Sequence, residues 1–207
     1  MPVTRDSLIL RISRGGDPAS WEEFFAIYYP FLHNVVRRWG VDDHDACDIV
    51  QDVFVTLLRA LPQFEFRPER GRFRGWLKTI VQNIAIDRLR RRGRLREVVI
   101  GEEPCAAELP ASDDEWDAAY QEQVASFAIQ QVRSTSAPAT WRCFEEHFLK
   151  ARPASDVAQE IGLSSGAVYM NASRTLSRIR AKCADYDADL VGAPRSLGRH
   201  VTPESAV

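Results

Sequence analysis

The chain has 207 residues, of which 45% are hydrophobic and 27% charged, and its formal net charge at pH 7 is −2. A chain of this length and composition is expected to form one globular unit or two small ones, with enough apolar side chains for a core. No run of about 18 apolar residues occurs, which excludes a membrane span, and the amino terminus lacks the pattern of a signal peptide. We therefore expect a cytoplasmic protein with no membrane partner.

Helices dominate the predicted structure of the first 100 residues. A short amphipathic helix around Leu8 is expected to end at the Gly-Gly-Asp-Pro stretch of residues 15–18. Longer helices are expected over residues 19–39 and 43–61, where apolar side chains recur every three or four positions. After a loop rich in Pro and Gly, a fourth helix is expected over residues 72–93.

The charge of this fourth helix is hidden by the near-neutral total. Residues 67–96 hold 11 basic residues against two acidic ones, whereas residues 97–122 hold nine acidic residues and no Lys or Arg. Such a sharp change of sign favours a basic face for a polyanion, followed by an acidic linker. Solvated charge on both segments is the alternative.

The second half of the chain begins with a segment that lacks apolar periodicity. Residues 98–114 are rich in Glu, Pro, Ala, Ser and Asp and predict a flexible tether. Helices are expected to resume near Glu115 and to follow over residues 139–150, 154–161 and 165–184, before a disordered tail. The predicted fold is all-α, with two small helical domains joined by a flexible acidic linker.

The last two of these helices fit a helix-turn-helix. Ala158 is small where a second helix crosses closely, Gly162 tolerates a positive φ in the turn, Leu163 fills the turn, and Ser164 can cap the next helix. The second helix would present polar side chains to base edges and arginines to phosphates. The candidate duplex-binding residues are Ser165, Tyr169, Asn171, Arg174 and Arg178. A plain helical hairpin with a solvated basic face is the alternative.

The fourth helix, which contains the stretch FRGWLKTIVQNIAIDRLRRR, combines aromatic, amide and cationic side chains. Trp76, Asn83 and Asp87 fall close to one stripe at about 100° per residue. Unpaired bases stack on exposed rings while cations hold the backbone, so the combination favours single-stranded nucleic acid. The candidate residues are Arg74, Trp76, Lys78, Asn83, Asp87, Arg88 and Arg91. Phe73 is expected to pack in the core, and a core role is also the alternative for Trp76.

The third helix is acidic near its start. Asp48, Gln51 and Asp52 would suit a basic surface of a partner protein. Compensation of the helix dipole explains part of this acidity without any partner, and spacing alone does not separate the two interpretations.

Sequence motifs of enzymes are absent. The cysteines and histidines form no CxxC pair, no HExxH and no other zinc spacing, and no phosphate-binding or nucleophile motif occurs. The only tempting acidic pair, Asp48 with Asp52, lacks further ligands. The sequence thus predicts a protein that is not an enzyme and has no metal site and no cofactor.

Taken together, DACDIVQDVFVTLLRAL, then FRGWLKTIVQNIAIDRLRRR, then a helix-turn-helix after an acidic linker resemble a bacterial sigma factor. The resemblance is greatest to the extracytoplasmic-function (ECF) group of the sigma-70 family and covers about residues 5–182. It implies four parts: a sigma2-like helical bundle (1–96), an acidic linker (97–114), a sigma4-like helix-turn-helix domain (115–184) and a tail (185–207).

The resemblance also implies partners. Asp48, Gln51 and Asp52 match the helix that docks on the clamp of the largest subunit of core RNA polymerase. Trp76, Asn83 and Asp87, with the cations around them, match the region that melts and reads the minus-ten promoter element. The helix-turn-helix matches the domain that binds the minus-thirty-five element as duplex. An anti-sigma factor or another regulator is a further expected partner.

One departure and one rival accompany this resemblance. The recognition helix of the family often carries Arg near the positions of Tyr169 and Asn171, so the resemblance does not give the base preference. The rival function is a two-domain helix-turn-helix transcription regulator that binds duplex DNA without joining RNA polymerase. That rival leaves Trp76, Asn83 and the surrounding arginines without a role.

Overall fold

The computed structural model describes residues 8–63, 73–100 and 112–187, and gives their side chains except for residues 63, 92–100 and 187. Every regular element among these residues is helical, which confirms the all-α prediction. The described residues divide into two compact units, 8–120 and 121–187. None of the described helices combines the length and the apolar character that crossing a membrane requires.

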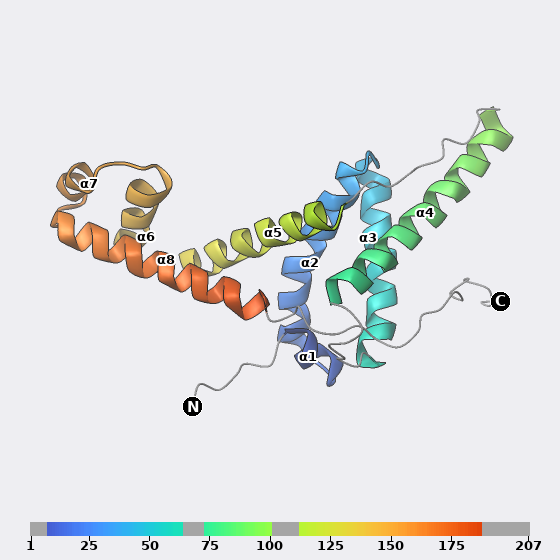
Figure 1. Cartoon of the computed structure of the whole chain (residues 1–207), viewed down its shortest axis with the longest axis horizontal. Helices are drawn as coiled ribbons and strands as arrows, with labels where there is room; N and C mark the ends of the chain where they lie inside the picture. The colour runs from blue at the N-terminus through green and yellow to red at the C-terminus, as the bar shows by residue number, and fades with distance from the viewer. Residues whose placement is uncertain (1–7, 64–72, 101–111, 188–207) are drawn as a thin grey trace. The chain divides into compact units, whose positions relative to one another are not determined.

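The first unit is built from four helices and one helix end. It contains α1 (Leu8–Ser13), α2 (Pro18–Arg38), α3 (Asp43–Ala60), the 3-10 turn η1 (Leu61–Gln63) and α4 (Phe73–Ile100), together with the first residues of α5 (Asp113–Ser134). In Figure 1, α2, α3 and α4 lie side by side, with α3 packed against both neighbours. Asp17 and Asp42 begin α2 and α3, because each carboxylate accepts an N–H bond three residues on.

An aromatic cluster forms the core of this unit. The Phe24 ring stacks on Tyr28 with centroids 4.3 Å apart, and Tyr28 meets Phe73 of α4 edge-on at 5.8 Å. The amino end of α5 joins the same cluster, since Trp116 lies 4.7 Å from Phe31 and the Tyr28 hydroxyl bonds that of Tyr120 at 3.3 Å. Edge-to-face and offset contacts of this kind add to the gain from burial.

The observed end of α4 differs from the predicted one, and with it the start of the segment that follows. The helix passes Gly93, where its end was predicted, because one interior Gly costs only about 1 kcal/mol and the flanking Arg and Leu are strong helix formers. It therefore enters the segment predicted as linker. The rest of that segment up to residue 111 and the tail beyond residue 187 lie outside the described residues.

The second unit contains the rest of α5, α6 (Pro138–Cys143), the π-helical segment η3 (Phe144–Leu149), α7 (Ala154–Ile161) and α8 (Ser165–Asp187). The helix predicted over residues 139–150 is thus α-helical only in its first half, and the Lys150 N–H bonds the Glu145 carbonyl five residues back. One cluster of its core joins α5, α6, η3 and α8, and a second one joins α6, α7 and α8.

The helix-turn-helix is present in α7 and α8. Gly162 has φ +71°, Ser164 accepts the Ala167 N–H at 3.2 Å, and Val168 packs inside with Val157. The prediction that Leu163 fills the turn is wrong. Its side chain is 37% exposed, because the backbone closes the turn itself through the Leu163 N–H and the Ala158 carbonyl.

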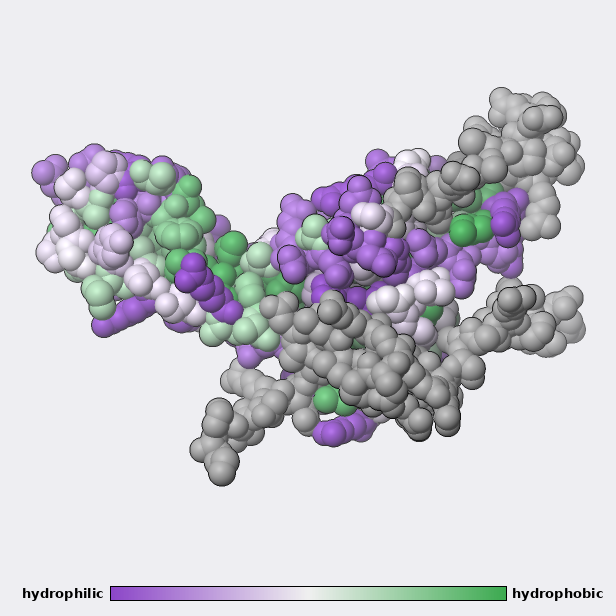
Figure 2. All heavy atoms as spheres, viewed as in Figure 1, coloured by the Kyte–Doolittle hydropathy of each residue, from purple (hydrophilic) through white to green (hydrophobic). Residues whose placement is uncertain are grey.

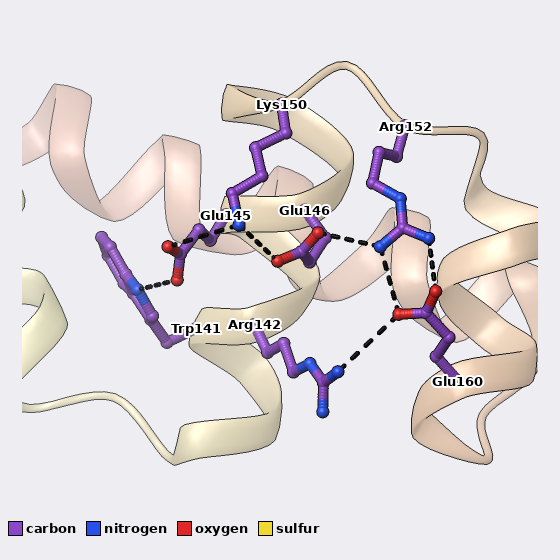
Figure 3. Close-up of polar contacts among 7 residues, drawn as sticks. All are labelled: Trp141, Arg142, Glu145, Glu146, Lys150, Arg152 and Glu160. Atoms are coloured by element: carbon purple, nitrogen blue, oxygen red, sulfur yellow. Dashed lines mark hydrogen bonds and ion pairs between the residues drawn. The ribbon is translucent and has the colours of Figure 1, made fainter.

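A network of ion pairs ties η3 to α7 (Figure 3). Glu146 accepts bonds from Lys150 at 2.7 Å and from Arg152 at 2.9 Å, and Arg152 also pairs with Glu160. These bonds hold a turn in which Ala151 takes a left-handed φ of +52°, a conformation that L side chains rarely adopt. Donation from Lys150 and Arg152 lowers the pKa of Glu146, and donation from Arg152 lowers that of Glu160.

Replacement of Gly162 by Ala should destabilise the protein by about 1–2 kcal/mol, because a Cβ is strained at its positive φ. Gly166→Ala is the matched control, since Gly166 lies in α8 without a positive φ and a Cβ there would meet no atom within 4 Å. Urea unfolding measures both changes. Equal stability of the two variants would contradict the expected strain.

The stability of the second unit should fall in acid. Glu146 and Glu160 have lower pKa values in the folded state than in the unfolded state. Their contribution to the free energy of unfolding is therefore complete above the ordinary pKa of 4.5, and it disappears as the pH drops through their pKa values in the folded state. Arg152→Met should reduce stability at pH 7 and flatten the acid dependence, as urea unfolding at several pH values would show. Arg174→Met, at an exposed position without these pairs, should keep the wild-type pH dependence.

Candidate nucleic-acid interface

The rotation of α4 about its axis decides which of its side chains face outward. Phe73, Leu77, Val81 and Ala85, spaced four residues apart, are fully buried. Ile80, which follows Trp76 by four residues, is also buried. The prediction of a core role for Phe73 is therefore confirmed.

The three residues predicted to meet unpaired bases differ in their exposure. Asn83 and Asp87 are exposed, and Asp87 pairs with Arg91 at 2.9 Å. Trp76 is half-buried, with its ring tilted against Phe73 at a centroid distance of 5.6 Å. The part of Trp76 that remains open thus lies at the edge of the core rather than on a free-standing face.

Two of the predicted DNA-binding cations are buried. The Arg74 side chain is 4% exposed, lies over the Tyr120 ring at 4.6 Å and approaches Asp117 to 3.3 Å. The Lys78 side chain donates to Asp113 at 2.7 Å, which lowers the pKa of Asp113. Both acidic partners lie at the amino end of α5. The structure therefore brings Arg74 and Lys78 together with α5 and not with Asn83.

Arg88 joins the predicted polymerase-binding and DNA-binding residues. Its guanidinium donates to Asp52 at 2.7 Å and also to Asp48, which ties α4 to α3. Gln51, between the two acids in sequence, is exposed. Two residues from the acidic helix and one from the basic helix thus form a single ion-pair network.

Exposed apolar residues lie beside this network on α3. Val55 is 47% exposed and lies four positions after Gln51, and Leu58 is 49% exposed and lies seven positions after Gln51. Sequence reasoning named neither Val55 nor Leu58 as a contact residue. Their spacing of four and seven residues from Gln51 is the signal that could have placed them on the same face of α3.

The predicted duplex-binding residues of α8 also separate into two groups. Ser165, Tyr169 and Arg174 are exposed, and the Tyr169 ring lies 5.4 Å from His147. Asn171 instead donates to the Cys143 sulfur at 3.9 Å, and that part of the helix is therefore turned toward the core of its own unit.

Arg178 also has partners within its own unit. Its guanidinium donates to the hydroxyls of Ser136 and Thr135 at 3.0 and 2.9 Å. Figure 2 shows hydrophobic residues reaching the surface of this unit beside hydrophilic ones. Met170, next to Tyr169, is 51% exposed and was not predicted as a contact residue.

Away from these surfaces, one group of metal-ligating side chains comes together among the described residues. His33 of α2 meets Asp43 and Cys47 at the start of α3. Sequence reasoning found no metal site because the three residues match no standard motif.

Comparison with known proteins supports the interpretation of α2 to α4. Residues 24–95 match the family model of sigma-70 region 2. The ECF RNA polymerase sigma factor SigE of Mycolicibacterium smegmatis is 23% identical over 177 residues, which are 84% of this chain and 66% of that protein. RNA polymerase sigma factor CnrH of Cupriavidus metallidurans is 31% identical over 102 residues, which are 49% of this chain and 51% of that protein.

The chain thus spans just under two thirds of the length of SigE and about half that of CnrH. The region 2 match coincides with the helices that carry the DIVQDVF and FRGWLKTIVQN stretches. Residues 24–95 are thus similar to region 2 of the sigma-70 family, and a larger part of the chain is similar to an ECF sigma factor.

Proposed function

We propose that the chain is a sigma factor that binds core RNA polymerase, directs it to specific promoters and stabilises promoter melting. The observation that carries this proposal is the α3–α4 pair within the region 2 match. On this pair an exposed polar and apolar face of α3 lies next to a helix that presents Asn83 outward. The protein would itself catalyse no reaction.

The polymerase-binding surface of the proposal lies on α3. Gln51 and Asp52 supply polar groups, and the half-exposed Val55 and Leu58 supply apolar area beside them. A small apolar centre with a polar rim is typical of protein interfaces. Asp48 and Asp52 would act together with Arg88, which offsets part of their charge, in docking on the clamp of the largest subunit.

The melting surface of the proposal lies on α4. Asn83 offers amide donors and an acceptor to an unpaired base, and the open edge of Trp76 offers a surface for stacking. A site that prefers separated strands shifts the equilibrium toward the melted promoter. Stacking worth about 1–3 kcal/mol per base is comparable with the few kcal/mol that unpairing costs.

Arg74 and Lys78 would contribute to DNA binding only after a change at α5. Asp113 and Asp117 occupy the positions that phosphates would take beside these cations. We therefore assign the amino end of α5 a competing role, in which it leaves Arg74 and Lys78 when single-stranded DNA binds.

Duplex binding is assigned to the helix-turn-helix. Exposed Ser165, Tyr169 and Arg174 are placed for contact with the minus-thirty-five element, with Arg174 at phosphates. Asn171 and Arg178 have partners within their unit and would contribute to DNA binding by exchanging them. An anti-sigma factor or another regulator remains a proposed partner of the whole protein.

Asn83→Ala should leave binding to core RNA polymerase intact and reduce promoter opening by about tenfold or more, since about 1.4 kcal/mol is a factor of ten. Gel filtration with core enzyme measures the first property and permanganate footprinting the second. Trp76→Ala should also reduce promoter opening. Because Trp76 packs on Phe73 as well, circular dichroism is used to check that this variant folds.

Thr79→Ala is the matched control for Asn83→Ala, because Thr79 is an exposed residue one turn away on α4. Normal opening by Asn83→Ala would refute the melting surface. Failure of the wild-type chain to bind core enzyme would refute the function as a whole and favour a regulator that acts on duplex DNA alone.

The double variant Asp113→Asn, Asp117→Asn should bind single-stranded promoter DNA more tightly, because it removes the two carboxylates that compete for Lys78 and Arg74. Titration of labelled oligonucleotide by fluorescence anisotropy measures the gain, expected to be several-fold at low salt. Glu115 lies in the same turn of α5 but pairs with neither Lys78 nor Arg74, so Glu115→Gln should change the affinity less. Equal effects of the two changes would contradict direct competition.

A further inference from the structure

The group formed by His33, Asp43 and Cys47 brings three kinds of metal ligand to one place. Asp43 and Cys47 are four residues apart on α3 and therefore share a face of that helix. His33 reaches them from α2, because the turn at Gly40, with φ +81°, returns the chain beside its own helix end. The imidazole, carboxylate and sulfur ligand atoms all lie within 4.8 Å of one another.

These distances are close to those of a metal centre. Ligand atoms that bind zinc at about 2.0–2.3 Å in a tetrahedron lie about 3.3–3.8 Å apart. The His33 Nε2 and Asp43 Oδ1 atoms are already 3.2 Å apart. Small side-chain rotations within the 4.8 Å limit would bring Cys47 to the same separation. The helices that carry the three ligands are packed together, so the backbone need not move.

The chemistry of the three ligands selects the type of ion. Calcium and magnesium prefer sites made of oxygen atoms alone, whereas thiolate and imidazole favour zinc and related transition metals. Three protein ligands leave one position of a tetrahedron for water. The Asp43 side chain is 76% exposed, so this position opens to solvent and an ion can enter.

One neighbouring residue, Tyr29, contacts two of the ligands. The Tyr29 ring lies nearly parallel to that of His33, with centroids 6.3 Å apart and 9° between the planes. A hydrogen bond to Cys47 raises the pKa of Tyr29, so the tyrosine contacts a second ligand as well. Support of this kind orients ligands in metal sites.

A simple ion pair explains only part of the arrangement. His33 and Asp43 can pair, and the Arg37 Nε atom lies 3.8 Å from the same Asp43 oxygen. The Arg37 guanidinium donates a shorter hydrogen bond to the Val41 carbonyl, at 2.5 Å. Neither contact accounts for the thiol of Cys47 beside the two other ligands.

We propose that His33, Asp43 and Cys47 bind one Zn²⁺ ion, with water as the fourth ligand. Binding would release the thiol proton of Cys47 to solvent and form bonds from the imidazole, carboxylate and thiolate to the ion. The ion would connect the carboxyl-terminal part of α2 to the start of α3, directly before Asp48. This proposal does not depend on whether the chain binds RNA polymerase.

The test is titration of the reduced full-length chain with Co²⁺, which takes zinc sites and absorbs visibly in a tetrahedral environment. One Co²⁺ per chain is expected, with a thiolate-to-cobalt band that excess Zn²⁺ removes. Cys47→Ser should lose this band, and His33→Gln should weaken binding by more than the roughly 10–100-fold typical of a lost supporting residue. Zn²⁺ should also raise the Tm of the wild-type chain and not that of Cys47→Ser.

Two matched controls lie outside the group. Cys183→Ser removes a thiol in α8, and His44→Gln removes an exposed imidazole next to Asp43, so both should keep the cobalt spectrum. A wild-type chain without the thiolate band, or a band that survives in Cys47→Ser, would overturn the proposal. If Cys47→Ser does not fold, as judged by circular dichroism, His33→Gln decides the question by its affinity.

Discussion

The packing of α4 against α2 and α3 fixes the position of every polar residue in the candidate interface. Phe73, Leu77 and Val81 are fully buried, and burial of each such side chain contributes about 1.5–3 kcal/mol. Rotation of α4 about its axis would expose all of them, so the helix has one orientation. That orientation turns Asn83 and Asp87 outward and leaves Trp76 at the edge of the core.

Burial also constrains the charges. A cation that is removed from water needs an acidic partner, because an unpaired buried charge is very costly. Arg74 and Lys78 meet this requirement with Asp117 and Asp113, and the partly buried Arg88 pairs with Asp48 and Asp52. The unpaired positive surface is therefore smaller than the number of basic residues in the sequence suggests. In the proposed function, DNA would have to replace existing carboxylates at some of these positions.

Ion pairs also constrain the helix-turn-helix, together with a small apolar core. Arg152 connects Glu146 of η3 with Glu160 of α7, across a turn that contains the left-handed Ala151. Exposed ion pairs are weak individually, but a network that shares one guanidinium orders several side chains at once. The orientation of α7, and through it that of the exposed Tyr169 on α8, depends on this network and on the small core around Val157 and Val168.

The sequence alone determined the helical class, most helix boundaries and the helix-turn-helix, because these follow from local periodicity and caps, and its short motifs indicated the similarity to sigma-70 region 2. Tertiary structure decided which members of each stripe are exposed: Leu58 and Val55 face outward, whereas Ile80, Arg74 and Lys78 are buried. It also brought His33 to Asp43 and Cys47, and Arg88 to Asp48 and Asp52. Periodicity describes one helix at a time, while burial, ion pairing and ligand clusters depend on which neighbouring helix faces it.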